Sequence, residues 1–325
     1  MAAEKLDVLQ TGGIPPYIEP QFDELFHMHK LHKAADRDVF LRDAAAKVRA
    51  IATFGAIPIT AEFMQKLPKL EIVANMGVGY DPVDAKWAGE HGIVVTNTPG
   101  VLDDEVADTT IALLLNTLRQ LPQSERYLRA GKWPEKPFPL TVSTLRDRTV
   151  GIVGMGRIGQ AIAKRIEAFG RPIVYHTRRP VADVSYRHYP DLLAMARDVD
   201  TLIAIVPGGA STRHMINREV LEALGPDGVL INVARGSVVD EQALIDALRT
   251  KKILSAGLDV FEDEPRVPKE LIEMDHVVLF PHVASASLHT RRAMAQLVVD
   301  NLKAWAEGKP PLTPVPETPW PPGKR

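Results

Sequence analysis

A glycine-rich loop between an apolar run and a helical pattern constrains the fold of this chain more than any other feature. Residues 149–170 read TVGIVGMGRIGQAIAKRIEAFG, with Gly154, Gly156 and Gly159 in G-x-G-x-x-G spacing. In such a segment the first glycine permits a tight turn, and the third lets the following helix pack closely against the preceding strand. The stretch therefore predicts a buried strand that passes through a tight turn directly into a helix.

The alternation of short apolar runs and helical patterns extends over most of the chain. Short, β-branched runs bounded by glycine, proline or a charge are typical of buried parallel strands, and helices between them complete βα units. We therefore expect an α/β protein with two parallel sheets. The first set of runs is KLDVLQ, VRAIATFG, EIVANMGVG and IVVTNTPG, separated by amphipathic, helix-like stretches such as FDELFHMHK and TAEFMQKL. The second set is TVGIVGMG, RPIVYHTR, TLIAIVPG, VLINVARG, ILSAGLDVF and HVVLFPHV.

Three further segments bear on domain organisation. Residues 103–120 form a long helical pattern whose first three residues are acidic, which suits a helix N-terminus. The proline-rich segment 121–145 that follows is too long for an ordinary loop. A last helix over 287–307 can cross back onto the first domain, which we therefore expect to be discontinuous. The tail from residue 310 has seven prolines in thirteen residues, which favours an extended strap.

Composition narrows the classes of partner. The 325 residues include 25% charged side chains with a formal net charge of −2, and no cysteine. Interspersed charges of both signs indicate small-molecule partners rather than nucleic acid or membrane. The absence of cysteine excludes disulfides, thiolate catalysis and cysteine-ligated metals. No leader pattern opens the sequence and no apolar run is long enough for a membrane span, so we expect a cytoplasmic protein.

The glycine loop is suited to bind the pyrophosphate of a dinucleotide. Gly156 lets the backbone approach the phosphates, and the helix N-terminus supplies amides and a positive dipole end. A methyltransferase could use a similar loop, so the residues after the next strand have to distinguish a nicotinamide-binding protein from a methyltransferase. NAD-binding proteins carry an acid there, about 20 residues on, but YHTRRP (175–180) has none. A hydroxyl and two guanidinium groups favour the 2′-phosphate of NADPH, with NADH as the weaker cofactor, unless the arginines merely face solvent.

Polar residues follow three later strands, at the edge where an open α/β sheet usually binds its ligands. They are Arg235 in INVARGSVVDE, Asp259 and Glu264 in GLDVFEDEP, and His282 in LFPHVAS. Reduction of a keto acid by a nicotinamide needs a cation for the carboxylate, a proton donor for the developing alkoxide and a group that keeps the donor charged. Arginine, histidine and glutamate meet these needs. Each alone is more often structural, so their occurrence on successive strands carries the prediction.

Motifs along nearly the whole chain share one pattern. They are NMGVGYDPVD (75–84), GIVVTNTPGVLDDEVAD (92–108), VGIVGMGRIGQAIAKR (150–165), LINVARGSVVDEQALIDAL (230–248), AGLDVFEDEP (256–265) and FPHVAS (280–285). This pattern resembles the D-isomer-specific 2-hydroxyacid dehydrogenases, and within them the NADPH-dependent glyoxylate/hydroxypyruvate reductases. The resemblance implies that Arg235 holds the substrate's carboxylate and carbonyl oxygen, and that His282 donates the proton. Glu264 would hydrogen-bond His282 and keep it protonated, while hydride passes from NADPH to the α-carbon, giving glycolate or D-glycerate.

The resemblance also implies the architecture and the remaining site residues. Residues 1–99 and 288–325 would form a flavodoxin-like substrate-binding domain, and 100–287 a Rossmann NADP-binding domain, with a cleft between them that closes on the substrate. Asp259 would contact the nicotinamide carboxamide. Substrate-binding residues would be Met76, Val78, Gly79, Arg235 and His282. Cofactor-binding residues would be Gly154, Gly156, Arg157, Ile158, Gly159, His176, Thr177, Arg178, Arg179, Val206, Pro207, Val233, Ala234, Arg235, Asp259, His282 and Ser285.

The segment 103–145 resembles the family's dimerisation arm, which implies a homodimer. Its stretch KWPEKPFPLT does not clearly match the position from which a partner's aromatic residue enters the pocket of such reductases. The sequence FPLT at residues 138–141, with GVGYD upstream, also resembles the plant-type hydroxyphenylpyruvate reductases. Reduction of aromatic keto acids is therefore the second hypothesis. A nicotinamide-sensing corepressor is a third, from another class.

Two other groups of residues are set aside. FHMHKLH (26–32) brings three histidines together, His27, His29 and His32, but without carboxylates nearby we expect solvated helix-end histidines and no metal site. Ser285 and Ser287 lie near His282, but there is no G-x-S-x-G elbow for a hydrolase.

Overall fold

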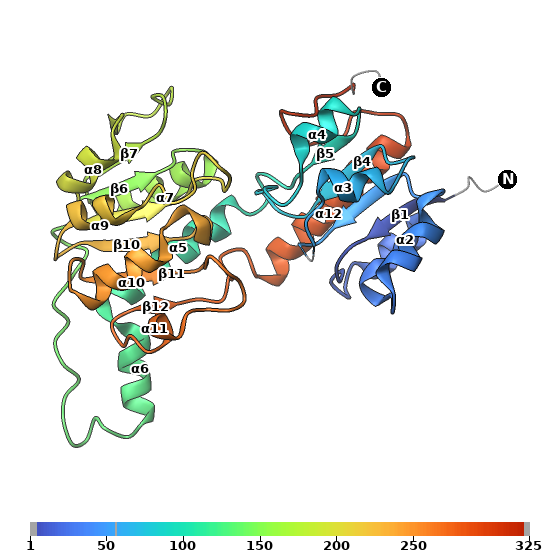
Figure 1. The fold of residues 1–325 in the computed structure, drawn as a ribbon. Helices are drawn as coiled ribbons and strands as arrows, with labels where there is room; N and C mark the ends of the chain where they lie inside the picture. Colours follow the sequence, from blue (N-terminus) through green and yellow to red (C-terminus); the bar gives the residue numbers. More distant parts are fainter. Residues whose placement is uncertain (1–4, 56, 322–325) are drawn as a thin grey trace. The chain divides into compact units, whose positions relative to one another are not determined.

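The chain divides into two compact units (Figure 1). The structure is a computed structural model that describes residues 5–55 and 57–321. Unit 1 comprises Met1–Leu102 and Ser287–Arg325, and unit 2 comprises Asp103–Ala286. Each unit contains one parallel sheet with helices on both faces, which confirms the predicted α/β class with two doubly wound sheets.

Unit 1 is built on a five-stranded parallel sheet in the order β2-β1-β3-β4-β5. The strand order reverses between β1 and β3, as in flavodoxin-like sheets. Every residue of β3 and β4 is buried, because helices cover both faces. The strands are β1 (Leu6–Gln10), β2 (Phe26–Lys30), β3 (Ala50–Thr53), β4 (Ile72–Asn75) and β5 (Val94–Thr96).

The helices of unit 1 form a layer on each face of this sheet. Successive side chains of β1 point to opposite faces, so Leu9 packs with α2, α3 and α4 while Val8 packs with α1 and α12. Helix α12 comes from the far end of the sequence and buries Leu302 and Trp305 against the sheet, which makes unit 1 discontinuous. The helices are α1 (Glu19–Leu25), the 3-10 turn η1 (Leu31–Lys33), α2 (Arg37–Ala45), α3 (Ala61–Gln65), α4 (Ala85–Glu90) and α12 (Leu288–Ala306).

Unit 2 is built on a seven-stranded parallel sheet in the order β12-β11-β10-β9-β6-β7-β8. Six of these strands have the dinucleotide-binding order 3-2-1-4-5-6, and β12 adds a seventh. The order reverses between β6 and β9, so ligands are expected at the carboxyl ends of these strands. The strands are β6 (Val150–Val153), β7 (Ile173–His176), β8 (Arg187–Tyr189), β9 (Thr201–Ala204), β10 (Val229–Asn232), β11 (Ser255–Leu258) and β12 (Val278–Leu279).

Helices also cover both faces of the second sheet. Leu114 of α5 and Ile162 of α7 pack on one face with Ile203 and Ile231 of the strands. Helices α8, α9 and α10 pack on the other face. The helices are α5 (Asp103–Arg119), α6 (Leu121–Arg129), α7 (Arg157–Ala168), α8 (Leu192–Asp198), α9 (Arg218–Leu224), the 3-10 turn η2 (Gly236–Val238), α10 (Glu241–Arg249) and α11 (Lys269–Ile272).

The stretch FDELFHMHK differs from the expected helix. Helix α1 ends at Leu25, and Phe26–Lys30 forms the edge strand β2. The physical reason is an alternation with period two: Phe26 and Met28 pack into the core with Phe22, so His27 and His29 point to the other face. Because one face of this strand carries histidines, it does not form the apolar run by which buried strands are predicted.

The two proline-rich segments adopt different structures. Residues 121–129 form helix α6, because Pro122 lies in its first turn, where proline is tolerated. Residues 130–149 are irregular, with α6 and the loop extending away from the sheet of unit 2 (Figure 1). The described part of the tail, residues 310–321, contains no helix and runs along β5, where the Val95 N–H donates to the Thr318 hydroxyl at 2.8 Å.

Candidate active site

The glycine loop joins β6 to α7 in unit 2, and two of its glycines are required by the protein itself. Gly154 has φ +103°, in the region that favours glycine, and its N–H donates to the His176 carbonyl at 2.9 Å. A Cβ on Gly159 would lie 2.2 Å from the Gly154 carbonyl oxygen, so the helix can approach the turn this closely only without a side chain. These contacts hold α7 at the end of β6.

Gly156 differs, because nothing in the protein demands a glycine there. Its φ is −76°, and a Cβ would meet no atom within 4 Å other than those of its chain neighbours. Gly156 is the N-cap of the 12-residue helix α7, and no side chain caps the helix. The helix N-terminus thus has no side-chain cap and there is space beside Gly156, which fits a pyrophosphate that approaches the backbone closely. Arg157, beside this turn, has its Nε 3.4 Å from the Asp103 carboxylate, and Ile158 packs into the core.

The YHTRRP stretch ends β7 with a hydrogen-bonded turn. His176 Nδ1 lies 2.9 Å from the Tyr189 carbonyl, to which it must donate, and this ties β7 to β8. The Thr177 hydroxyl donates to the Arg179 carbonyl at 2.6 Å, so it has to release this bond to donate to a phosphate. Arg178 and Arg179 are exposed, and within residues 5–55 and 57–321 neither guanidinium has a hydrogen bond or ion pair. Two unpaired guanidinium groups at this edge fit a 2′-phosphate.

Arg235 follows β10 in a loop held by Asn232. The buried Asn232 side chain donates to the Arg235 carbonyl at 3.0 Å and accepts from the Ala234 N–H at 3.0 Å. Arg235 itself donates from Nη1 to the Ala234 carbonyl at 2.7 Å. Val233 and Ala234 point their side chains into the core, so only their backbone can face a ligand.

Asp259 fixes the segment that carries His282. This carboxylate follows β11, is 1% exposed, and accepts from the N–H groups of Val283 at 2.7 Å and Ala284 at 2.9 Å. Its carbonyl accepts from the His282 N–H at 2.8 Å. Burial raises the pKa of the Asp259 carboxyl, although the two backbone hydrogen bonds and His282 act to lower it. His282 has φ +54°, an uncommon conformation for a non-glycine residue, and these contacts hold it there.

Glu264 and His282 form a directly bonded pair. Glu264 Oε2 lies 2.6 Å from His282 Nδ1, and Oε1 accepts from the Phe261 N–H at 3.0 Å. Burial raises the pKa of Glu264, but the bonds from His282 and Phe261 and the charges of His282 and Arg235 outweigh this and lower it. The His282 side chain is 47% exposed. With Nδ1 held by a carboxylate, Nε2 is the nitrogen available for proton transfer.

A second group of predicted residues lies in unit 1, in the loop after β4. The carbonyls of residues 77–79 accept from side-chain amides: Asn75 Nδ2 bonds Gly77 at 3.2 Å and Gly79 at 3.1 Å, and Asn97 Nδ2 bonds Val78 at 2.8 Å. In a trans peptide the N–H of one residue points opposite to the C=O of the residue before it, so the Val78 N–H faces away from Asn75 and the Gly79 N–H faces away from Asn97. Neither amide is turned toward the asparagine that fixes its peptide, so both are candidates to bind a carboxylate.

The other predicted residues lie near these segments. Met76 opens the same loop, with its N–H on the Thr53 carbonyl at 3.0 Å. Val206 follows β9 beside Gly154, Pro207 is exposed next to it, and Ser285 is partly buried just after His282. In unit 2 the structure therefore brings the glycine loop, the YHTRRP turn, Arg235 and the Glu264–His282 pair to the carboxyl edge of one sheet.

Sequence reasoning missed the asparagines that position these groups. Asn75 and Asn232 each end a strand, in EIVANMG and LINVARG, and both are buried. A polar side chain at the end of an otherwise apolar run was the available signal, because buried amides need backbone partners. Asn97 lies just after β5 and carries the same signal.

The arrangement defines a class: a dinucleotide-binding α/β protein with a bonded histidine–glutamate pair at the carboxyl edge of its sheet. Comparison with known proteins agrees. The family model described as "D-isomer specific 2-hydroxyacid dehydrogenase, NAD binding domain" matches residues 111–284. Glyoxylate/hydroxypyruvate reductase A of Arabidopsis thaliana is 44% identical over 312 residues, which cover 96% of this chain and 99% of that protein. The chain therefore belongs to the D-isomer specific 2-hydroxyacid dehydrogenase family, as its motifs indicated.

Two further relatives bear on substrate and cofactor. The crystal structure of an NADPH-dependent glyoxylate/hydroxypyruvate reductase from Sinorhizobium meliloti, in complex with NADP and malonate, is 50% identical, with a TM-score of 0.90 and 99% coverage of both chains. A hydroxyphenylpyruvate reductase of Plectranthus scutellarioides is 44% identical over 313 residues, which cover 96% of this chain and 99% of that protein. In the described part of this chain, every helix is too short or too polar to cross a membrane.

Proposed function

We propose that this protein reduces glyoxylate and hydroxypyruvate to glycolate and D-glycerate with NADPH. The observation that carries the proposal is the Glu264–His282 pair, bonded at 2.6 Å, at the sheet edge that also bears Arg235. The 50% identical Sinorhizobium meliloti enzyme and the 44% identical Arabidopsis thaliana enzyme, both glyoxylate/hydroxypyruvate reductases by name, support the choice of substrate.

Each group at this edge has a defined task in the proposed reaction. When bound, NADPH supplies the hydride for the α-carbon of the keto acid. The Arg235 guanidinium binds the substrate's carboxylate and carbonyl oxygen, for which its planar fork of donors is suited. His282 donates its Nε2 proton to the oxygen as negative charge develops there. The Glu264 carboxylate orients the ring through Nδ1 and balances its positive charge before the transfer.

The two units divide the binding tasks in this proposal. Unit 2 holds NADPH through the glycine loop, the turn after β7 and the segments after β9, β10 and β11. Asp259 contacts the nicotinamide carboxamide, for which it has lone pairs beyond those used by Val283 and Ala284. The amides of Val78 and Gly79 in unit 1 bind the substrate carboxylate, with Met76 beside them.

Cofactor choice is assigned to the turn after β7, and a single charge deletion tests it. Arg178→Ala removes an exposed guanidinium, so the KM for NADPH should rise about 10- to 100-fold, the effect of a lost hydrogen bond to a charged group, while the KM for NADH stays constant. Arg171→Ala, at the other end of β7, is the control and should change neither value. An unaltered NADPH preference, in this variant and after His176→Asp is added, would contradict the assignment.

The same proposal includes a homodimer and a cytoplasmic location. The support for a dimer comes from the predicted arm, residues 103–145, in which α6 buries no residue and Leu128, Trp133, Leu140 and Val142 are more than half exposed. Monomeric proteins rarely leave so many large apolar side chains together in water. A second copy of the chain is the partner that would cover them.

Reduction of aromatic keto acids is the second candidate, favoured by the 44% identical hydroxyphenylpyruvate reductase. Steady-state kcat/KM values for glyoxylate, hydroxypyruvate and phenylpyruvate, with both cofactors, decide between the two. We expect the small keto acids to be preferred with NADPH, and a clear preference for phenylpyruvate would reverse the order.

His282→Asn should lower turnover by about 10²- to 10⁴-fold with NADPH binding retained. No NADPH oxidation with any keto acid would favour a corepressor-like binding protein.

A further inference from the structure

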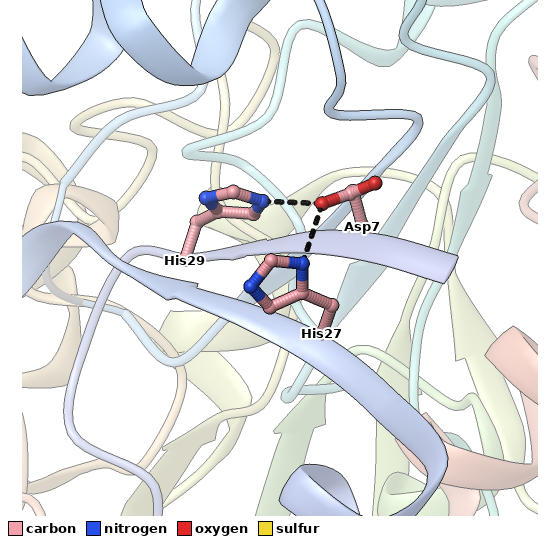
Figure 2. Close-up of side chains that lie close together, drawn as sticks. All are labelled: Asp7, His27 and His29. Carbon is pink, nitrogen blue, oxygen red and sulfur yellow. Dashed lines mark hydrogen bonds and ion pairs between the residues drawn. The ribbon is translucent and has the colours of Figure 1, made fainter. Parts of the chain in front are cut away.

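Three side chains with metal-binding atoms meet on the sheet of unit 1, away from the loops assigned to the substrate. Strand β1 pairs with β2 in parallel, and the register places Asp7 opposite His27 and Leu9 opposite His29. Since alternate residues share a face, Asp7, His27 and His29 all lie on the same side of these two strands. Figure 2 shows both imidazole rings turned toward the Asp7 carboxylate.

Both histidines contact the same carboxylate oxygen of Asp7. Asp7 Oδ1 lies 2.6 Å from His29 Nε2 and 3.0 Å from His27 Nδ1 (Figure 2). All three donor atoms lie within 4.8 Å of one another. Ligand atoms of a tetrahedral zinc site are about 3.3 Å apart, given metal–ligand distances near 2.0 Å. A divalent ion therefore needs only small shifts of these side chains to bind all three.

Burial supports a preformed site with an open side. The side chains of Asp7 and His29 are 22% and 15% exposed, and the His29 ring packs edge-on against Phe40 at 6.5 Å between centroids. His27 is 62% exposed, so an ion can enter from solvent and keep water in its remaining positions. Because two of the three ligands are already largely buried, binding has to order little more of the protein, which lowers its entropic cost.

Neighbouring positive charges are directed elsewhere. Lys30 follows His29 at the end of β2, and its ammonium binds Glu19 at 2.8 Å and Asp23 at 3.1 Å. Lys5 donates to the Asp23 carbonyl at 2.8 Å. Alternation along β2 places Lys30 on the opposite face from His29, so it does not occupy the place of a cation.

We propose that Asp7, His27 and His29 bind one divalent transition-metal ion of the zinc type. Two imidazoles and one carboxylate suit Zn²⁺ and similar ions. They suit Mg²⁺ and Ca²⁺ less well, because those two ions favour ligands that are all oxygen. To bind the ion, each histidine gives up the hydrogen it shares with Asp7, either to its other ring nitrogen or to solvent. The site ties edge strand β2 to β1, so the bound ion stabilises the edge of the unit 1 sheet.

Metal titration of the full-length protein tests this directly. After treatment with EDTA and removal of the chelator, we expect calorimetry to show one equivalent of Zn²⁺ per chain, and Co²⁺ to give the visible absorption of a low-coordinate nitrogen and oxygen site. The melting temperature should rise with Zn²⁺. No binding, or a Co²⁺ spectrum identical to that of the ion in buffer, would overturn the proposal.

Matched variants assign the ion to these residues. His27→Ala removes the exposed ligand and should weaken Zn²⁺ binding at least tenfold and abolish the thermal shift, and Asp7→Asn should act in the same direction. His91→Ala is the control, because this exposed histidine of unit 1 stacks on Trp87 instead. Equal Zn²⁺ affinity in His27→Ala and His91→Ala would contradict the assignment. If His27→Ala fails to fold, His27→Gln serves the same comparison.

Discussion

Glu264 is the residue whose charge state most directly affects the proposed acid. Its pKa is lowered from the ordinary value of 4.5, because the bonds from His282 and Phe261 outweigh its burial. A lowered folded-state pKa contributes stability that is fully present above the unfolded-state pKa and is lost as the pH falls through the folded-state value. The contribution of the Glu264 carboxylate to stability is therefore present at neutral pH and is lost in acid, below pH 4.5.

Glu264→Gln should separate charge from shape at this position. We expect its urea denaturation midpoint to depend less on pH than that of the unchanged protein in the range below 4.5, where the carboxylate titrates. Keto-acid reduction should slow, since the His282 ring has lost the carboxylate that orients it. Glu270→Gln, an exposed glutamate on α11, is the control. Unchanged keto-acid reduction, together with an unchanged pH dependence of the denaturation midpoint, would show that the carboxylate does not act on His282.

Asn97 acts on the site through a backbone carbonyl, and we assign it as a positioning residue. Asn97→Ala loses the 2.8 Å bond to Val78, so the amides of Val78 and Gly79 should lose their fixed direction. The KM for the keto acid should rise about fivefold, the effect of roughly 1 kcal/mol, with kcat less affected and NADPH affinity constant. Asn116→Ala, whose side chain bonds only within α5, is the control. A fall in kcat at constant KM would contradict a positioning role.

At the scale of elements, the glycine loop separates what the fold needs from what a ligand needs. In Gly159→Ala the new Cβ would lie 2.2 Å from the Gly154 carbonyl oxygen, so we expect a loss of about 1–3 kcal/mol in stability. In Gly156→Ala the Cβ meets no protein atom, so the melting temperature should change little while NADPH affinity falls at least tenfold. Thermal melts and cofactor titration of both variants provide the measurement. Unimpaired NADPH binding by Gly156→Ala would show that no phosphate approaches this backbone.

Elements buried on both faces could be predicted from the sequence, and elements with a polar face could not. The runs that became β6, β9 and β10 are mostly apolar, and every residue in them is buried, because helices cover both sides of their sheet. Strand β2 is at an edge of the sheet and carries histidines on one face. Its sequence therefore lacks the continuous apolar run of a buried strand, and the stretch FDELFHMHK predicts a helix instead. The pairing of Asp7 with His27 depends on the register of β1 and β2, which local sequence does not specify.

The same limit applies to the candidate site. Arg235, Glu264 and His282 could be singled out because each follows a strand and reductive chemistry needs those groups. Asn75 and Asn97 carry no chemistry of their own, and their role depends on which carbonyls a folded loop turns toward them. The same holds for the hydrogen bonds that the Asp259 carboxylate accepts from the N–H groups of Val283 and Ala284. They join the ends of β11 and β12, which lie side by side only because of the order of strands in the sheet.

At the scale of the whole molecule, unit 1 depends on both ends of the chain. Leu302 and Trp305 of α12 are buried against strands formed by the first hundred residues, and Val315 in the tail packs on the opposite face of the same sheet. The first hundred residues therefore cannot complete their core until the last helix is available. Unit 2, by contrast, is one continuous segment, Asp103–Ala286.

Assembly is the property that the arm should decide. Leu140 and Val142 are 97% and 83% exposed, and burying two such side chains in a partner contributes about 3–6 kcal/mol to association. Sedimentation velocity should therefore give a dimer for the unchanged protein and a monomer for Leu140→Asp combined with Val142→Asp, because a buried carboxylate without a partner is strongly unfavourable. Leu312→Asp changes another exposed leucine, 56% exposed and outside the arm, and should remain dimeric. A monomer without any substitution, or a dimer in the doubly charged variant, would mean that this arm does not hold two copies together.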